Sequence, residues 1–159
     1  MQTNTIIVGL DHSPAGEAAL RWAAAYAARA DARLHLLHVI EIEPSSIYGS
    51  TAELARDLRA QMFPELQAFA TEVIGATLPS ESWTLDIVQG ARGRRLVEAA
   101  AAADLLVIGT REHVGLQRLL AGSVSHYCLA HSETPVVAVP PPTPVDLRPA
   151  STAGALHRS

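Results

Sequence analysis

The chain has 159 residues, 48% of them hydrophobic and 18% charged, with a formal net charge of −4. These values indicate one folded domain and disfavour a nucleic-acid partner or a membrane surface, because both favour basic faces on a protein. All 12 residues counted as lysine or arginine are arginine, which excludes a Walker A loop, a Schiff-base lysine and the ATP-pairing lysine of kinases.

Compartment and anchoring are predicted from the cysteine count and the apolar runs. Cys128 is the single cysteine, so no disulfide framework or cysteine zinc cluster can form. The first five residues do not resemble a signal peptide, and no apolar run reaches the roughly 20 residues of a membrane span. We therefore expect a cytoplasmic protein with no membrane partner.

Short apolar runs alternate with helical patterns along the chain. The predicted strands are 5–9, 34–40, 83–88, 105–108 and 136–139, and the predicted helices are 14–29, 50–77, 94–103 and a segment within 116–131. Pro64 predicts a kink, or two abutting helices, within 50–77. Polar alternation in 83–88 favours an edge position for that strand.

The alternation predicts a doubly wound α/β domain, a single parallel sheet with helices on both faces. Residues 1–139 form the predicted domain, and residues 140–159, rich in proline, serine and alanine, form a tail that we expect to be disordered. Ligands of such sheets bind beyond the strand C-termini where the strand order reverses. If strands 5–9 and 105–108 are neighbours, the loops that follow them face this crevice.

The first loop carries a carboxylate and a helix cap. Asp11 follows the strand, and Ser13 can cap the next helix with Pro14 at its first position. Asp11 can accept hydrogen bonds from ribose hydroxyls or bind a metal, or it can simply support the turn and the helix dipole. The residues alone leave these alternatives open.

The second loop begins at Gly109 and leads to Gly122 and Ser123, near the start of a predicted helix. Glycines allow close backbone approach, and free N–H groups at a helix start attract anions. These groups could hold a phosphate chain without any lysine. They could equally be two glycine turns and a serine cap.

Several motifs together resemble the universal stress protein family. They are Val8-Gly9-x-Asp11-x-Ser13, Leu37-His38-Val39, Gly109-Thr110-Arg111, Gly122-Ser123-Val124-Ser125 and Pro135-Val136-Val137-x-Val139, and the match covers residues 5–139. The resemblance implies the strand order 3-2-1-4-5 and a homodimer formed through the last strand, at Val136, Val137 and Val139. Many members of the family bind ATP and others do not.

The family's ATP-binding pattern, Gly-x2-Gly-x9-Gly-Ser/Thr, falls on Gly109, Glu112, Gly122 and Ser123. The resemblance implies an adenine-nucleotide site in which Asp11 meets the ribose and Val39 presents backbone groups to adenine. The other implied nucleotide contacts are Gly9, Ser13, Gly109, Arg111, Glu112, Gly122, Ser123, Val124 and Ser125.

Glu112 departs from this pattern, because it stands where the second glycine belongs. A side chain costs roughly 1–2 kcal/mol if the position needs positive φ. A carboxylate about 4 Å from a phosphate charge costs up to about 4 kcal/mol at an effective dielectric near 20. Glu112 can therefore abolish ATP binding, shift the preference to a ligand with fewer phosphates, or join Asp11 in holding Mg²⁺.

Three functions compete at this stage. The first is a dimeric stress-response module that binds ATP or a relative, and the second is a stress protein without nucleotide that acts through protein partners. The third is an enzyme, which we do not expect, although slow ATP hydrolysis is compatible with the sequence. His12 and His113 flank the predicted crevice and could touch a phosphate, whereas His38 and Cys128 are predicted to be packed residues. Arg92, Arg94 and Arg95 could reach an anion, but the pattern favours a solvated helix start.

Overall fold

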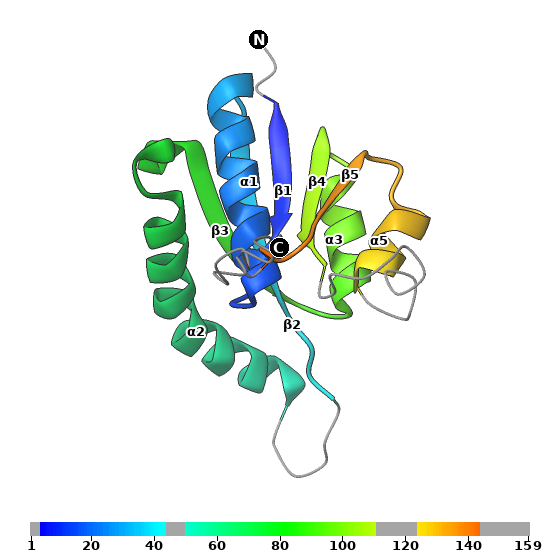
Figure 1. Ribbon diagram of the computed structural model, residues 1–159. Coiled ribbons are helices and arrows are strands. Elements are labelled where there is room, and N and C mark those ends of the chain that lie inside the picture. The colour runs from blue at the N-terminus through cyan, green and yellow to red at the C-terminus, as the bar shows by residue number, and fades with distance from the viewer. Residues whose placement is uncertain (1–3, 44–49, 111–123, 144–159) are drawn as a thin grey trace, which may run out of the picture.

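The computed structural model describes residues 4–43, 50–110 and 124–143, which form a three-layer α/β domain (Figure 1). Five parallel strands form one sheet in the order β3-β2-β1-β4-β5, which confirms the predicted order. The strands are β1 (Thr5–Gly9), β2 (Arg33–Ile40), β3 (Trp83–Gln89), β4 (Leu105–Gly109) and β5 (Val136–Val139). The helices are α1 (Pro14–Ala30), α2 (Thr51–Ile74), α3 (Arg92–Ala100) and α5 (Val124–His131), with 3₁₀ turns at Gly75–Thr77 and Ser80–Ser82.

The central strands are short apolar runs that both faces of the sheet cover. The middle residues of β1 and β4 are fully buried, and Ile7 of β1 lies opposite Leu106 of β4. Strands buried on both faces read as continuous apolar segments, which is why their bounds followed closely from the sequence. The strand order reverses at β1, so the carboxyl ends of β1 and β4 flank the switch point of the sheet.

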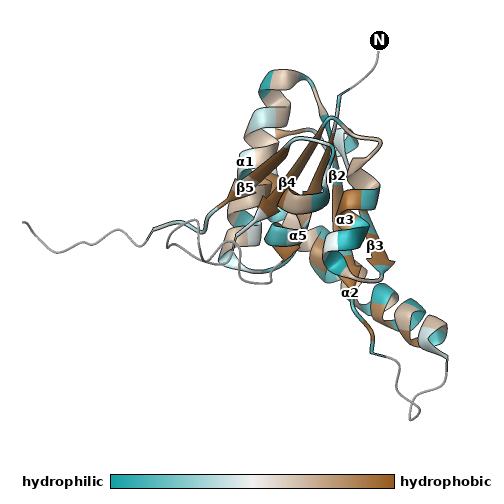
Figure 2. Ribbon diagram, turned by 90° about the vertical axis from the view of Figure 1, so that its right-hand side faces the viewer, coloured by the Kyte–Doolittle hydropathy of each residue, from teal (hydrophilic) through white to brown (hydrophobic). Residues whose placement is uncertain are grey.

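The larger core lies between the sheet and helices α1 and α2. Helix α1 turns an alanine-rich stripe toward the sheet, whose strands are strongly hydrophobic (Figure 2), and α2 and β3 supply larger residues to the same core. Ser13 caps α1 by accepting a hydrogen bond from Gly16 N, as expected, and Pro14 follows at the first position. Small residues let the helix approach the sheet closely, so this face is densely packed.

Helix α2 is one continuous helix rather than two. Pro64 lies inside it, and the helix axis changes direction along its length (Figure 1). Proline removes one backbone hydrogen bond and crowds the preceding turn, so a bend is the expected outcome. No helix among the described residues is long and apolar enough to cross a membrane.

The smaller core lies on the opposite face, under α3 and α5. Cys128 is fully buried there, as expected, and burial raises the pKa of its thiol from 9.0 to about 11. The two helices meet closely, because a Cβ at Gly93 would lie 2.8 Å from the ring of Tyr127. A crevice lined in part by residues of this core, Leu37, Leu96 and Ile108, opens beside it.

Candidate functional site

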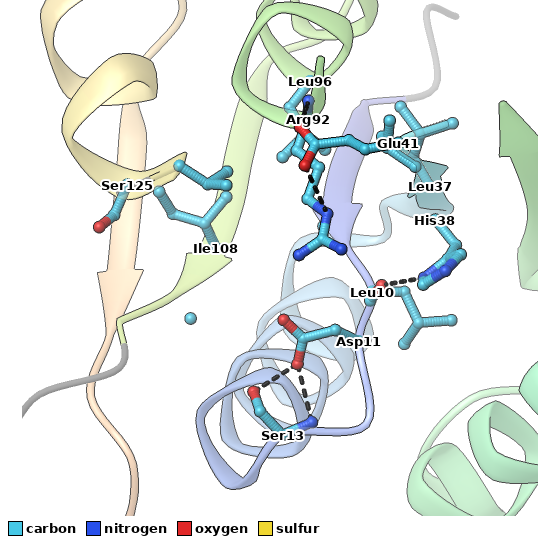
Figure 3. A pocket seen from close by; sticks show the side chains of 14 residues that line it. Leu10, Asp11, Ser13, Leu37, His38, Glu41, Arg92, Leu96, Ile108 and Ser125 are labelled. Carbon is cyan, nitrogen blue, oxygen red and sulfur yellow. Dashed lines mark hydrogen bonds and ion pairs between the residues drawn. The ribbon is translucent and has the colours of Figure 1, made fainter. Parts of the chain in front are cut away.

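A crevice of about 330 Å³ opens at the carboxyl ends of β1, β2 and β4 (Figure 3). This volume lies within the range of small-molecule sites, and the position is the one that doubly wound sheets use for ligands. Four segments line it: the loop after β1, the end of β2, the start of α3, and the end of β4 with the start of α5. The lining residues are Gly9, Leu10, Asp11, Ser13, Leu37, His38, Val39, Glu41, Arg92, Leu96, Ile108, Gly109, Val124 and Ser125.

Asp11 is held in place by the residue that caps α1. Its Oδ1 accepts hydrogen bonds from the backbone N–H of Ser13, at 2.8 Å, and from the Ser13 hydroxyl. The Ser13 Oγ in turn accepts the N–H of Gly16 at 3.0 Å. Asp11 therefore supports the turn, and its second oxygen accepts no hydrogen bond from the described residues. That oxygen is available to a ligand hydroxyl.

Two glycines let the backbone approach closely around this carboxylate. A Cβ at Gly16 would lie 2.2 Å from Asp11 Oδ1 and 2.5 Å from Asp11 O. A Cβ at Gly109 would lie 2.6 Å from the backbone C and O of Ala15. Side chains at these positions would push the end of β4 and the Asp11 carboxylate away from α1. The close approach predicted for Gly109 is therefore made to the first turn of α1.

The end of β2 provides a second polar group. His38 donates its Nδ1–H to Leu10 O at 2.8 Å, which confirms the expected packed, hydrogen-bonded histidine and ties the end of β2 to the loop after β1. Glu41 Oε1 accepts the backbone N–H of Arg92 at 2.9 Å, and Glu41 Oε2 lies 3.7 Å from Arg92 Nε. The guanidinium of Arg92 points into the crevice, on the side where Asp11 lies (Figure 3).

The structure brings together seven of the residues that the sequence proposed for the site. Arg111, Glu112, Gly122 and Ser123 lie outside the described residues, so the three alternatives for Glu112 stay open. The seven residues that line the crevice are Gly9, Asp11, Ser13, Val39, Gly109, Val124 and Ser125.

His12 and Arg92 differ from the sequence expectation. His12 does not line the crevice; its ring lies 4.7 Å from that of Phe69, on the α2 side. Helix α3 begins at Arg92, two residues before the predicted start, and Arg92 lines the crevice instead of belonging to a solvated helix end. No local signal distinguishes Arg92 from Arg94 and Arg95. Leu10, Glu41, Leu96 and Ile108 also line the crevice without having been singled out.

Strand β5 forms the edge of the sheet beside β4. Its side chains are apolar and all of them are partly exposed, with Val137 and Val139 against the larger core and Val136 against the smaller one. Edge strands with apolar faces are open to pairing with another chain. The three predicted interface valines therefore lie where a second copy could add its own strand.

No group of three or more potential metal ligands occurs within the described ranges 4–43, 50–110 and 124–143. Asp11 is the described carboxylate of the predicted magnesium pair, and Glu112 falls in the range 111–123 that is not described. Only the sequence pattern therefore supports a metal at this site.

A parallel sheet in the order 3-2-1-4-5, with a crevice at its switch point, defines a doubly wound α/β domain. The model of the universal stress protein family matches residues 2–140, so the chain belongs to this family. The resemblance found in the sequence is thereby confirmed.

Individual relatives agree with this assignment. A universal stress protein of Mycolicibacterium smegmatis is 32% identical over 139 residues, covering 84% of this chain and 47% of that protein, so the chain spans about half its length. Universal stress protein MJ0531 of Methanocaldococcus jannaschii is 28% identical over 86% of this chain and 82% of that protein. A universal stress protein solved in complex with cAMP is 26% identical with a TM-score of 0.68, covering 86% of this chain and 96% of that one.

Proposed function

We propose that this protein is a stress-response module that binds an adenine nucleotide in the crevice between β1 and β4 and transmits its presence through a homodimer. The observation that carries the proposal is the Asp11 carboxylate, fixed by Ser13 at the rim of the crevice with one oxygen available. The structural relative solved with cAMP supports an adenine ligand.

The residues present fit such a ligand along the length of the crevice. Val39, at the end of β2, can present backbone groups to a base, and Asp11 can accept the ribose hydroxyls. Gly109 and the first turn of α5, Val124 and Ser125, form the opposite end. Helix starts favour negative charge, so we assign the phosphates to this end.

We propose that the crevice binds its nucleotide and does not catalyse a rapid reaction. Asp11 already accepts two hydrogen bonds from Ser13, an arrangement that suits a positioning group better than a general base, which must exchange its proton. We therefore propose a nucleotide sensor, not an enzyme.

Calorimetric titration of nucleotide-stripped protein with ATP, AMP and cAMP, with and without Mg²⁺, tests this function. Micromolar binding of any of them supports it, and a requirement for Mg²⁺ supports the metal role of Asp11 and Glu112. The Glu112→Gly variant should then bind ATP more tightly, by about tenfold or more, if repulsion or strain at that position opposes the triphosphate. Absence of binding to all three ligands refutes the nucleotide function and leaves protein partners as the function to pursue.

The homodimer is tested separately from the ligand. Val137→Glu places a charge on the edge strand and should shift the protein from dimer to monomer in analytical ultracentrifugation, because burying an unpaired carboxylate is costly. Val137→Ile keeps the apolar edge and serves as the control. An intact dimer of the glutamate variant would rule out an interface at β5.

A further inference from the structure

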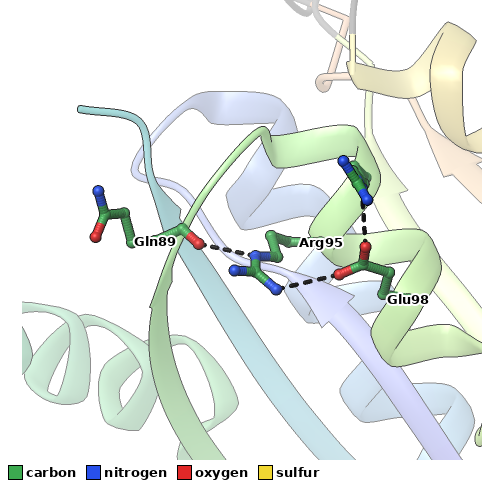
Figure 4. A network of polar contacts seen from close by, with 4 residues as sticks. Gln89, Arg95 and Glu98 are labelled. Carbon is green, nitrogen blue, oxygen red and sulfur yellow. Dashed lines mark hydrogen bonds and ion pairs between the residues drawn. The ribbon is translucent and has the colours of Figure 1, made fainter. Parts of the chain in front are cut away.

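Of the three arginines at the start of α3, Arg92 alone lines the crevice. Arg94 Nε donates to Glu98 Oε1 at 2.9 Å. Arg95 donates its Nε to Gln89 O at 2.8 Å and its Nη1 to Glu98 Oε2 at 3.2 Å (Figure 4). Both are therefore tied to their own helix and to the end of β3, on the outside of the domain.

Arg92 has a defined anchor and unused donors. Glu41 Oε1 accepts the backbone N–H of Arg92, and Glu41 Oε2 lies 3.7 Å from Arg92 Nε. These two contacts fix where the Arg92 side chain leaves the helix. That Nε is buried and has no hydrogen-bond partner among the described residues, although the whole side chain is 42% exposed. The guanidinium thus enters the crevice with donors that the described part of the protein does not satisfy.

The position of Arg92 favours the base over the phosphates. Arg92 is anchored to Glu41, just beyond the end of β2, and its guanidinium points toward Asp11, whereas Ser125 at the start of α5, where we propose the phosphates, lies on the other side of the crevice (Figure 3). The neighbouring Glu41 carboxylate offsets the positive charge, so the pair offers little net attraction to a polyphosphate. A planar guanidinium next to an acceptor suits a heteroaromatic ring, which it can stack on or donate to.

We propose that Arg92 is a specificity-determining residue that contacts the base of the bound nucleotide and that Glu41 positions its guanidinium. This role of Arg92 rests on the proposed nucleotide function and adds to it a residue that recognises the base of the ligand. It requires that the contribution of Arg92 to affinity be the same whatever the number of phosphates.

Titrating wild type, Arg92→Ala and the matched control Arg94→Ala with adenosine, AMP and ATP tests this. We expect Arg92→Ala to weaken all three ligands by the same factor, roughly tenfold, and Arg94→Ala to weaken none. Binding of ribose 5-phosphate, which lacks a base, should not change in Arg92→Ala. Glu41→Gln should weaken the three ligands by a smaller common factor, because the guanidinium loses its charged anchor.

The outcomes separate the two proposals. A loss that grows with each phosphate and steepens at low salt overturns the base contact in favour of a phosphate contact. Unchanged affinities, or an equal loss for ribose 5-phosphate, also overturn it, the latter because it would show a general structural defect. If wild type binds none of the adenine ligands, the proposed function fails and this inference fails with it.

Discussion

Two walls of the crevice are built in opposite ways. The Asp11 wall, residues 11–16, is held by hydrogen bonds within six consecutive residues and by contacts with no room for a side chain at Gly16. The Arg92 wall, formed by Glu41 and Arg92, depends on one hydrogen bond and one longer ion pair between half-exposed side chains. The first wall is fixed before a ligand arrives, whereas the second can adjust to it.

This difference suggests that the two walls contribute differently to ligand recognition. A preorganised carboxylate loses little freedom on binding, so it can contribute affinity to any ribonucleotide. A half-exposed arginine on a separate helix contributes according to the ring that it meets. Substitutions in the Asp11 wall should therefore affect both folding stability and binding, and those in the Arg92 wall should affect mainly binding.

Gly16→Ala is expected to have the largest effect. Its Cβ would lie 2.2 Å from Asp11 Oδ1, so the carboxylate or the helix start must shift. We expect a loss of about 2–3 kcal/mol in the free energy of unfolding, measured by chemical denaturation, and a nucleotide affinity at least tenfold weaker.

Gly75→Ala is the control for Gly16→Ala. No atom lies within 4 Å of a Cβ at Gly75, so this variant incurs only the strain of φ +51° and should bind nucleotide normally. If Gly16→Ala is as stable as wild type and binds as tightly, the Asp11 wall adjusts freely and the contrast between the walls is lost.

Ser13→Ala removes the cap of α1 and both side-chain contacts of the Ser13 hydroxyl. Loss of an N-cap costs about 1 kcal/mol, up to about 2, so we expect a destabilisation of this size in denaturant melts. Ser13→Thr keeps a hydroxyl and should recover most of the stability. A stability loss without weaker ribonucleotide binding would show that Ser13 caps the helix but does not position Asp11.

High pH tests the packing behind the Arg92 wall. Cys128 Sγ lies 3.9 Å from Gly93 O on α3, and burial raises the pKa of the thiol to about 11. The folded state therefore keeps the thiol proton more tightly than the unfolded chain does. The stabilisation is complete below pH 9 and decreases between pH 9 and 11, by about 1 kcal/mol at pH 10.

Other groups also titrate at high pH, so the Cys128→Ala variant is needed to isolate the contribution of the thiol to the pH dependence of stability. Its free energy of unfolding should fall less than that of wild type between pH 8 and pH 10. If the free energy of unfolding falls equally in wild type and in Cys128→Ala between the two pH values, the thiol is not desolvated in the folded protein.

Glu41→Gln should have the smallest effect on stability. The amide oxygen can still accept the Arg92 N–H, and the lost ion pair joins side chains that are 52% and 42% exposed. Exposed pairs contribute less than about 1 kcal/mol, so the change in melting temperature should be close to the detection limit. A large destabilisation would show that the Arg92 wall is as rigid as the Asp11 wall.

The sequence predicted the strands better than the Arg92 wall, for a physical reason. Strands β1 and β5 were placed at their observed bounds because apolar β-branched runs and their flanking residues are local signals. Asp11 and Ser13 were also found, since a cap and its carboxylate lie close together in the chain. The start of α3 was missed by two residues because its acceptor, Glu41, lies 51 positions away.

Arg92 shows the same limit at the level of a single side chain. Three arginines within four positions are equivalent in sequence, and only the arrangement of α3 against β2 separates Arg92 from Arg94 and Arg95. His12 was misplaced for the related reason that Phe69 of α2, distant in sequence, provides a ring to contact. Contacts with residues distant in sequence therefore determine where the side chains of Arg92 and His12 lie.

The hydrogen bond between Glu41 and the first N–H of α3 also bears on how the chain folds. Ala91, at the N-cap position of α3, provides no side-chain hydrogen bond, so this nine-residue helix has no local start signal. Isolated helices of this length are marginal in water. The start of α3 therefore depends on a contact of high sequence separation, whereas the cap of α1 lies within that helix's own first turn.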